Sequence, residues 1–121
     1  MTWVYQQSTG NLSHTDELIA CGYSGKGECK NDPGSQTRHN EGPIPCGHYE
    51  IQEPRDTITH GPFVLPLAPN MDNTMFGRSG FLIHGDSIEA AGTASEGCII
   101  LGRVIRSRIW SSGDRDLQVI E

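Results

Sequence analysis

Cys98 and His84 are the residues of this chain whose types and order suggest covalent chemistry. A cysteine nucleophile needs a nearby base to take its proton, and an imidazole within hydrogen-bond reach raises the thiolate fraction. His84 follows an apolar run, so its ring is expected where a core strand emerges. Asp86 or Glu89 would orient that ring. The pattern predicts a thiol and imidazole pair for nucleophilic catalysis.

The segment directly before Cys98 supplies the other parts that such chemistry requires. Gly97 has no Cβ to block the approach of a substrate, and the N–H groups of Gly97 and Cys98 are candidate donors to an oxyanion. Ser95 would hold the loop through a bond from its side chain to the backbone. Arg78, upstream of the same strand, is a candidate for bidentate binding of a substrate carboxylate.

The strands that must position these residues are predicted from short apolar runs separated by turn residues. The composition, with 15 Gly, 7 Pro and 35% hydrophobic residues, favours a mainly β fold with one or two short helices in a single domain spanning residues 1–121. Residues 104–110 suit a short amphipathic helix. The proline in the run 63–67 predicts an edge or bulged strand. Other strands are expected in residues 3–5, 81–83 and 117–120, and a further strand is expected to follow Gly47.

The charge and hydropathy of the chain argue against two classes of partner. The net charge is −6 and no run of Lys or Arg is present, so binding to nucleic acid is not expected. No apolar stretch is long enough to span a bilayer, so no membrane insertion is expected. The first residues lack the pattern of a signal peptide, which predicts synthesis in the cytoplasm without one.

The four cysteines and five histidines show no spacing typical of a metal site. No C-x-x-C pair or H-E-x-x-H helix is present, so neither a metal nor a cofactor is predicted. A disulfide between two of Cys21, Cys29 and Cys46 stays open, as does the alternative that these are free thiols.

The motif His84-Gly85-Asp86 followed by Ser95-Glu96-Gly97-Cys98 resembles the catalytic signature of L,D-transpeptidases. One position departs from that signature, because Glu96 stands where the housekeeping enzymes have a histidine. Matches along most of the chain resemble one branch in particular, the L,D-transpeptidase-like toxins exported by the type VI secretion system. They include residues 3–5, 22–25, 31–33, 42–49, 61–62, 77–78 and 81–86.

The resemblance implies the β-sandwich or barrel of an L,D-transpeptidase catalytic domain and a two-step acyl transfer on the peptide stems of peptidoglycan. Cys98 would attack the carbonyl of the third stem residue, release the terminal D-alanine and leave a thioester. Water would then complete an L,D-carboxypeptidase reaction, or a free D-amino acid would complete an exchange. Tyr23, Ser24, Gly85 and Asp86 would join Arg78 in binding the substrate.

The same resemblance implies an antibacterial toxin that a component of the secretion machinery delivers to the periplasm of a target cell. An immunity protein would then protect the producing cell. Two other classes stay open: a zinc-dependent wall amidase or carboxypeptidase, and a non-catalytic cell-wall-binding module in which Cys98 is merely buried.

Overall fold

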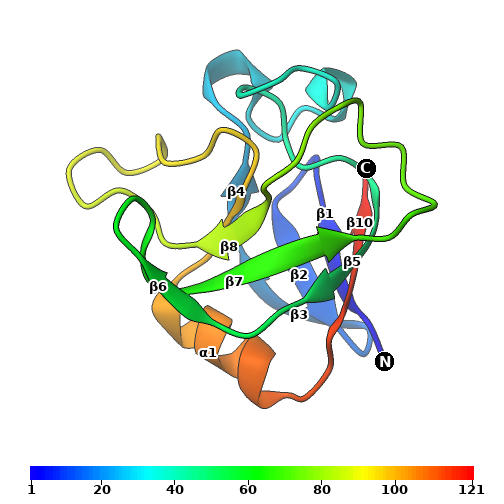
Figure 1. The fold of residues 1–121 in the computed structure, drawn as a ribbon, viewed down its shortest axis with the longest axis vertical. Coiled ribbons are helices and arrows are strands. Elements are labelled where there is room, and N and C mark those ends of the chain that lie inside the picture. Colours follow the sequence, from blue (N-terminus) through cyan, green and yellow to red (C-terminus); the bar gives the residue numbers. More distant parts are fainter.

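A curved sheet of ten strands forms most of the protein, which a computed structural model describes over residues 1–121 (Figure 1). Its strands follow the order β3-β2-β1-β10-β5-β7-β8-β9-β4, and β6 pairs with β7. The helical segments are α1 (Arg103–Ser111) and two single turns of 3-10 helix, Gly27–Cys29 and Pro33–Ser35. This architecture confirms the predicted fold class. The strands are β1 (Trp3–Gln6), β2 (Asn11–His14), β3 (Glu17–Cys21), β4 (Tyr23–Ser24), β5 (Gly47–Ile51), β6 (Arg55–Thr57), β7 (Gly61–Pro69), β8 (Leu82–His84), β9 (Ile99–Ile100) and β10 (Asp116–Ile120).

The two edges of the sheet return to each other, because β3 and β4 stand at opposite ends of the strand order but are separated in sequence only by Gly22. At this seam the N–H of Gly22 donates to the carbonyl of Gly10 over 2.8 Å. A Cβ on Gly22 would lie 2.0 Å from the carbonyl oxygen of Ile100. The seam therefore requires glycine for close backbone approach, and the sheet is nearly a closed barrel.

The core follows from the alternation of side chains along the strands. In β1 the side chains of Trp3 and Tyr5 are buried, whereas the residues beside them are only partly covered. The single cluster inside the sheet has 15 buried residues drawn from both halves of the chain: Trp3, Tyr5, Leu12, Ile44, Tyr49, Ile51, Leu65, Leu67, Phe81, Ile83, Ile99, Leu101, Ile109, Leu117 and Val119.

The proline predicted an edge or a bulged strand, and for β7 the edge alternative is wrong, whereas a register shift does interrupt its pairing with β6. Strand β7 has β5 on one side and β8 on the other, so it lies inside the sheet. Pairing with β5 stops at Leu67, opposite Ile51. Pro66 comes just beyond that last pair, and its carbonyl still accepts from the N–H of Gln52 over 2.9 Å. The missing N–H of Pro66 thus falls where the β5 ladder has ended, which explains why proline is tolerated there.

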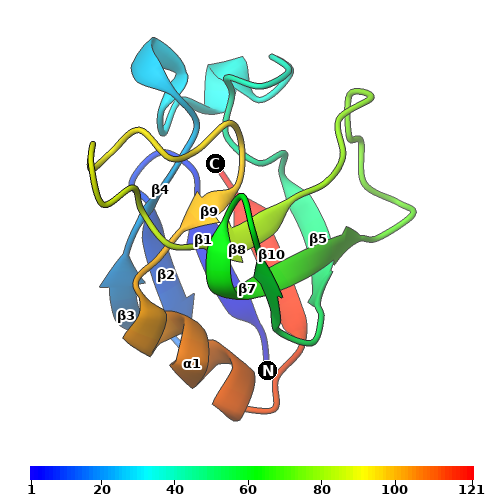
Figure 2. The same cartoon turned by 60° about the vertical axis from the view of Figure 1, so that its left-hand side comes forward.

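Helix α1 occupies the position predicted for a short amphipathic helix, and Figures 1 and 2 place it at one end of the sheet, where it contacts β7 and β8. Its buried face carries Ile109 and also Arg106, an unusual residue for that side. No helix of the structure is long and apolar enough to cross a membrane.

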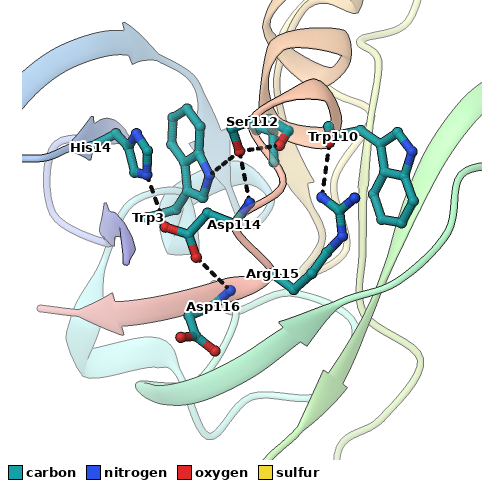
Figure 3. A network of polar contacts seen from close by, with 8 residues as sticks. Trp3, His14, Trp110, Ser112, Asp114, Arg115 and Asp116 are labelled. Carbon is teal, nitrogen blue, oxygen red and sulfur yellow. Dashed lines mark hydrogen bonds and ion pairs between the residues drawn. The ribbon is translucent and has the colours of Figure 1, made fainter. Parts of the chain in front are cut away.

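A polar network fixes the end of α1 against the first two strands (Figure 3). The indole of Trp3 donates to the hydroxyl of Ser112 over 3.2 Å and stacks on the ring of His14, with centroids 4.0 Å apart. His14 in turn lies 2.9 Å from a carboxylate oxygen of Asp114. These contacts fix the segment between α1 and β10. They thereby fix the position of the helix at the end of the sheet.

Candidate active site

A cleft of about 1130 Å³ opens where the turn between β6 and β7, the end of β8 and helix α1 meet. Figure 1 shows the β6–β7 turn and the loop of residues 85–97 projecting from the same side of the sheet. Cys98 and His84 both line this cleft, as do Gly85, Asp86 and Gly97. The structure thus brings together five of the nine residues predicted for the site. The cleft is also lined by Phe81, His60 and Arg106.

Strand pairing explains why Cys98 and His84 face the same space. Strands β8 and β9 are parallel, with Ile83 opposite Ile99. Cys98 precedes Ile99 and His84 follows Ile83, so both point to the face opposite that buried pair. They are diagonal neighbours across two strands, and no hydrogen bond joins the thiol to the imidazole in the structure.

The orientation of the His84 ring is set by the backbone rather than by a carboxylate. Its Nδ1 lies 2.8 Å from the carbonyl oxygen of Gly85. Because a carbonyl can only accept, Nδ1 must carry the proton and Nε2 is left as the acceptor. Neither Asp86 nor Glu89 forms a hydrogen bond with the ring, although the charge of Asp86 acts to raise its pKa. His84 therefore presents an unprotonated Nε2, as a general base requires.

Electrostatics keep His84 neutral and Cys98 protonated in the resting protein. Burial lowers the pKa of His84 below its ordinary value. Charge repulsion from His60 and Arg106 lowers this pKa further. Burial raises the pKa of the Cys98 thiol to about 11, although a hydrogen bond with the backbone of Leu82 acts to lower it. The pair rests as thiol and imidazole rather than thiolate and imidazolium.

The loop before Cys98 is held by serine hydroxyls, as predicted for Ser95. Ser95 Oγ donates to the carbonyl of Cys98 over 2.6 Å and accepts from the N–H of Gly97 over 3.1 Å. Gly97 has a φ of +140°, a conformation that favours glycine. The Gly97 N–H is therefore already bonded and does not fit the oxyanion role predicted for it. The N–H of Cys98 donates to no group in the protein and remains the candidate donor.

Arg78 occupies a different environment from the one predicted. It is buried, does not line the cleft, and its two terminal nitrogens donate to backbone carbonyls. Nη1 contacts the carbonyls of Gln36 and Pro43 at 2.6 and 2.7 Å, and Nη2 contacts those of Gly42 and Glu96 at 2.8 and 3.4 Å. No fork remains for a substrate carboxylate, so the guanidinium instead joins the loop of residues 36–43 to the loop before Cys98.

Tyr23 and Ser24 also support the cleft without lining it. The Tyr23 hydroxyl donates to Asp86 over 2.6 Å and accepts from the N–H of Ala94 over 2.9 Å, which fixes both ends of the loop of residues 85–97. Ser24 is fully buried and its hydroxyl donates to the carbonyl of Gly97 over 2.8 Å. Their positions give both residues a structural role instead of the predicted contact with substrate.

Two residues at the cleft were missed by reasoning from the sequence. His60 lies on the β6–β7 turn, with its ring centroid 4.6 Å from that of His84. No local pattern identifies it. Arg106 is 6% exposed, and its signal was its spacing, three residues before the fully buried Ile109 on α1. A charged residue on the buried face of a short helix is an indication of a special environment.

The remaining cysteines and histidines lie apart from this site. All four cysteines are free, and Cys29 is buried while Cys21 is exposed. No three side chains of His, Cys, Asp or Glu gather closely enough to hold a metal ion.

Comparisons with known proteins concern the fold and the family. A search of curated proteins found no match. Among solved structures, L,D-transpeptidase 1 of Mycobacterium tuberculosis is similar, with a TM-score of 0.54 at 15% sequence identity. The match covers 99% of this chain and 61% of that one, and it establishes the fold. The family model of the Tlde1 domain matches residues 19–119. The chain therefore belongs to the Tlde1 domain family, a family of L,D-transpeptidase-like type VI effectors.

Proposed function

We propose that the protein is a cysteine-dependent enzyme that cleaves the L,D peptide bond of tetrapeptide stems in peptidoglycan, with Cys98 as nucleophile and His84 as general base. The observation that carries the proposal is the placement of both side chains on one face of the β8–β9 pair, at one cleft, with Nε2 of His84 free to accept. Family membership and the L,D-transpeptidase fold support peptidoglycan as the substrate.

The chemistry follows from these two groups. Nε2 of His84 takes the thiol proton as the sulfur of Cys98 bonds to the carbonyl carbon of the third stem residue. In this proposal the Cys98 N–H stabilises the oxyanion that results. The carbon–nitrogen bond to D-alanine then breaks, and the leaving amine takes the proton from His84. A thioester remains on Cys98.

The thioester is resolved by the reverse sequence. His84 removes a proton from water as the oxygen attacks the thioester carbonyl. The carbon–sulfur bond then breaks, and the sulfur takes that proton from His84 to restore the thiol. This completes an L,D-carboxypeptidase reaction. When a free D-amino acid attacks in place of water, the product is an exchanged stem. The cleft is open to solvent and accommodates either acceptor.

A small movement completes the pair, because thiol and imidazole are not hydrogen-bonded in the structure. Catalytic hydrogen bonds often tighten only when the substrate is bound. Since burial raises the pKa of Cys98 to about 11, the proton must be removed during attack rather than beforehand.

The biological part of the proposal rests on the effector family. Type VI effectors are secreted, and we propose that this one acts in the periplasm of a target cell, where shortened or exchanged stems would no longer serve as donors for cross-linking. A cell that makes the enzyme would then need an immunity protein that blocks the cleft.

The test is digestion of purified peptidoglycan followed by mass analysis of the muropeptides. We expect the loss of one D-alanine from tetrapeptide stems, or its replacement when a free D-amino acid is added. Cys98→Ala and His84→Ala should abolish the change, whereas Cys21→Ala, at an exposed thiol outside the cleft, should not. An unchanged profile with folded wild-type protein would refute the proposal.

Two variants of that experiment separate the other classes. Inhibition by a chelator together with resistance to a thiol-alkylating reagent would indicate a zinc hydrolase. If Cys98→Ala still killed cells when directed to the periplasm, the protein would act by binding the wall rather than by cleaving it.

A further inference from the structure

The two arginines buried near the cleft differ in how well their guanidinium groups are satisfied. Arg78 gives both terminal nitrogens to four backbone carbonyls. Arg106 uses only Nη1, which donates to the carbonyls of Pro62 and Phe63 at 3.1 and 3.0 Å. Its Nε is buried without any partner, and its Nη2 donates to no group in the protein. One complete edge of the Arg106 guanidinium is therefore unoccupied.

Nη2, at one end of this edge, lies at the wall of the cleft beside Gly85. Arg106 lines the cleft although it is only 6% exposed. A Cβ on Gly85, another cleft residue, would lie 3.1 Å from Nη2 and 3.6 Å from Cζ. The absence of a side chain at Gly85 thus leaves the approach to Nη2 open. The charge of Arg106 also acts on the ring of His84, whose pKa it lowers.

The charge of Arg106 has no compensation inside the protein. The only ion pairs are His14 with Asp114 and Arg38 with Glu41. Asp86, the cleft carboxylate next to Gly85, already accepts from Tyr23 and from the N–H groups of Ser87 and Gly92. A buried, unpaired cation is costly, and the cost is recovered when an anion binds to it.

We propose that Arg106 binds a carboxylate of the peptide stem through its Nε and Nη2 edge, and that it selects stems whose terminal residue has a free carboxylate. The N–H groups of this edge are parallel and match the two oxygens of a carboxylate. The inference rests on the proposed function and adds the group that positions the scissile bond. Two stem carboxylates share the required chemistry: the one at the chain terminus and the one on the side chain of a diamino-acid third residue.

The first test compares three synthetic tetrapeptide stems: one with both carboxylates free, one with a terminal carboxamide and one with a side-chain carboxamide. In the wild type we expect the terminal carboxamide to lower kcat/KM roughly 10- to 100-fold, the range for loss of a charge-assisted contact. In Arg106→Met the two stems, with a free or an amidated terminal carboxylate, should have about the same kcat/KM, so the discrimination between them is lost. If the side-chain carboxamide gives the larger loss, the proposed selection of the terminus is wrong.

A merely structural role for Arg106 would lower the rate on all three stems alike and leave the discrimination intact, which would overturn the inference. Because Arg106→Met also removes the donors to Pro62 and Phe63, two further variants guard against misfolding. Arg106→Lys keeps the charge but loses the fork, and Gly85→Ala crowds Nη2; both should reduce the discrimination. Arg108→Met, on the exposed side of α1, is the matched control and should leave it unchanged.

The second test needs no activity on peptidoglycan. Iodoacetate is anionic and iodoacetamide is neutral, and their relative rates at Cys98 can be read by peptide mass spectrometry, with exposed Cys21 as the internal standard. We expect Arg106→Met to lower the iodoacetate-to-iodoacetamide ratio at Cys98 at least threefold and to leave the ratio at Cys21 unchanged. An unaltered ratio at Cys98 overturns the anion site. If Arg106→Met lowers the ratio at Cys98 but the wild-type protein cleaves none of the stems, the anion site stands and only the proposed function is refuted.

Discussion

The hydroxyl of Ser95 donates a 2.6 Å hydrogen bond to the carbonyl oxygen of Cys98, the residue that carries the candidate nucleophile. The Ser95 hydroxyl oxygen also accepts from the N–H groups of Gly25 and Gly97, at 2.9 and 3.1 Å. One atom therefore joins the loop after β4 to the loop before β9. Ser95 does not line the cleft, so its part in the site is to position the thiol.

We expect Ser95→Ala to lower the free energy of unfolding by about 1–3 kcal/mol, because it leaves two buried N–H groups without an acceptor. Activity on peptidoglycan should fall as well, since the Cys98 backbone is released. Urea unfolding measures the first effect. Ser8→Ala is the control, because that side chain is exposed and makes no hydrogen bond. An unfolding midpoint equal to that of the wild type would show that the three bonds contribute nothing.

Gly97→Ala should disable the site by steric conflict. A Cβ on Gly97 would lie 2.5 Å from Nη2 of Arg78 and 3.0 Å from the ring of Phe81, and the φ of +140° disfavours any other residue. Arg78 cannot move aside, because four carbonyls hold it. We expect a loss of at least about 2 kcal/mol in the free energy of unfolding and severe loss of activity. Gly34→Ala, at an exposed turn with ordinary contacts, should change neither; a Gly97→Ala enzyme of normal activity would contradict the geometry.

The pH dependence of the reaction should follow His84. Burial, His60 and Arg106 lower the pKa of His84 below 6.5, and only the neutral ring can act as base. The rate should therefore rise with pH through that lowered value and be more than half maximal at pH 6.5. Arg106→Met, which removes one of the lowering charges, should move this acid limb to higher pH.

Between pH 7 and 9 the rate should be flat, because the pKa of Cys98 is about 11 and the thiol stays protonated without His84. Initial rates on a soluble stem peptide, measured across this range, provide the check. A tenfold increase per pH unit would mean instead that hydroxide, not His84, removes the thiol proton.

Arg78 should matter for stability far more than for substrate binding. Arg78→Met removes donors from four backbone carbonyls, and we expect it to lower the free energy of unfolding by roughly 2–4 kcal/mol. Arg78→Lys should recover part of this loss. Thermal unfolding measures the effect of each variant on stability. KM, measured at a temperature below the unfolding transition, shows whether substrate binding changes as well. A raised KM with unchanged stability would return Arg78 to the substrate-binding role first predicted for it.

The elements that could be predicted from the sequence are those whose signals are local. Alternation in residues 3–5, the apolar run before His84 and the spacing of Ile105 and Ile109 each indicate the correct strand or helix, because burial of one face sets the period. The position of His84 at the end of β8 and that of Cys98 just before β9 could be predicted for the same reason, whereas their catalytic roles stay a prediction.

The environment of each arginine could not be predicted, because it depends on backbone groups far away in the sequence. Arg78 is satisfied by carbonyls 18 to 42 residues away, and those of Arg106 are 43 and 44 residues away. No sequence feature near either residue indicates which guanidinium will find hydrogen-bond acceptors and which will keep unpaired donors. The position of Pro66 inside the sheet could not be predicted for a similar reason, since its tolerance depends on where β5 ends.

The parallel pairing of β1 with β10 places residues 3–6 beside residues 117–120 in the middle of the sheet. During synthesis, Trp3 and Tyr5 pair with Leu117 and Val119 only after the more than 100 residues between them have been translated. The barrel therefore closes in a late step with a large loop-closure cost. A nascent chain halted within α1 would contain both Cys98 and His84 but lack β10, the strand that joins β1 to β5, so the sheet that carries the candidate site would still be incomplete.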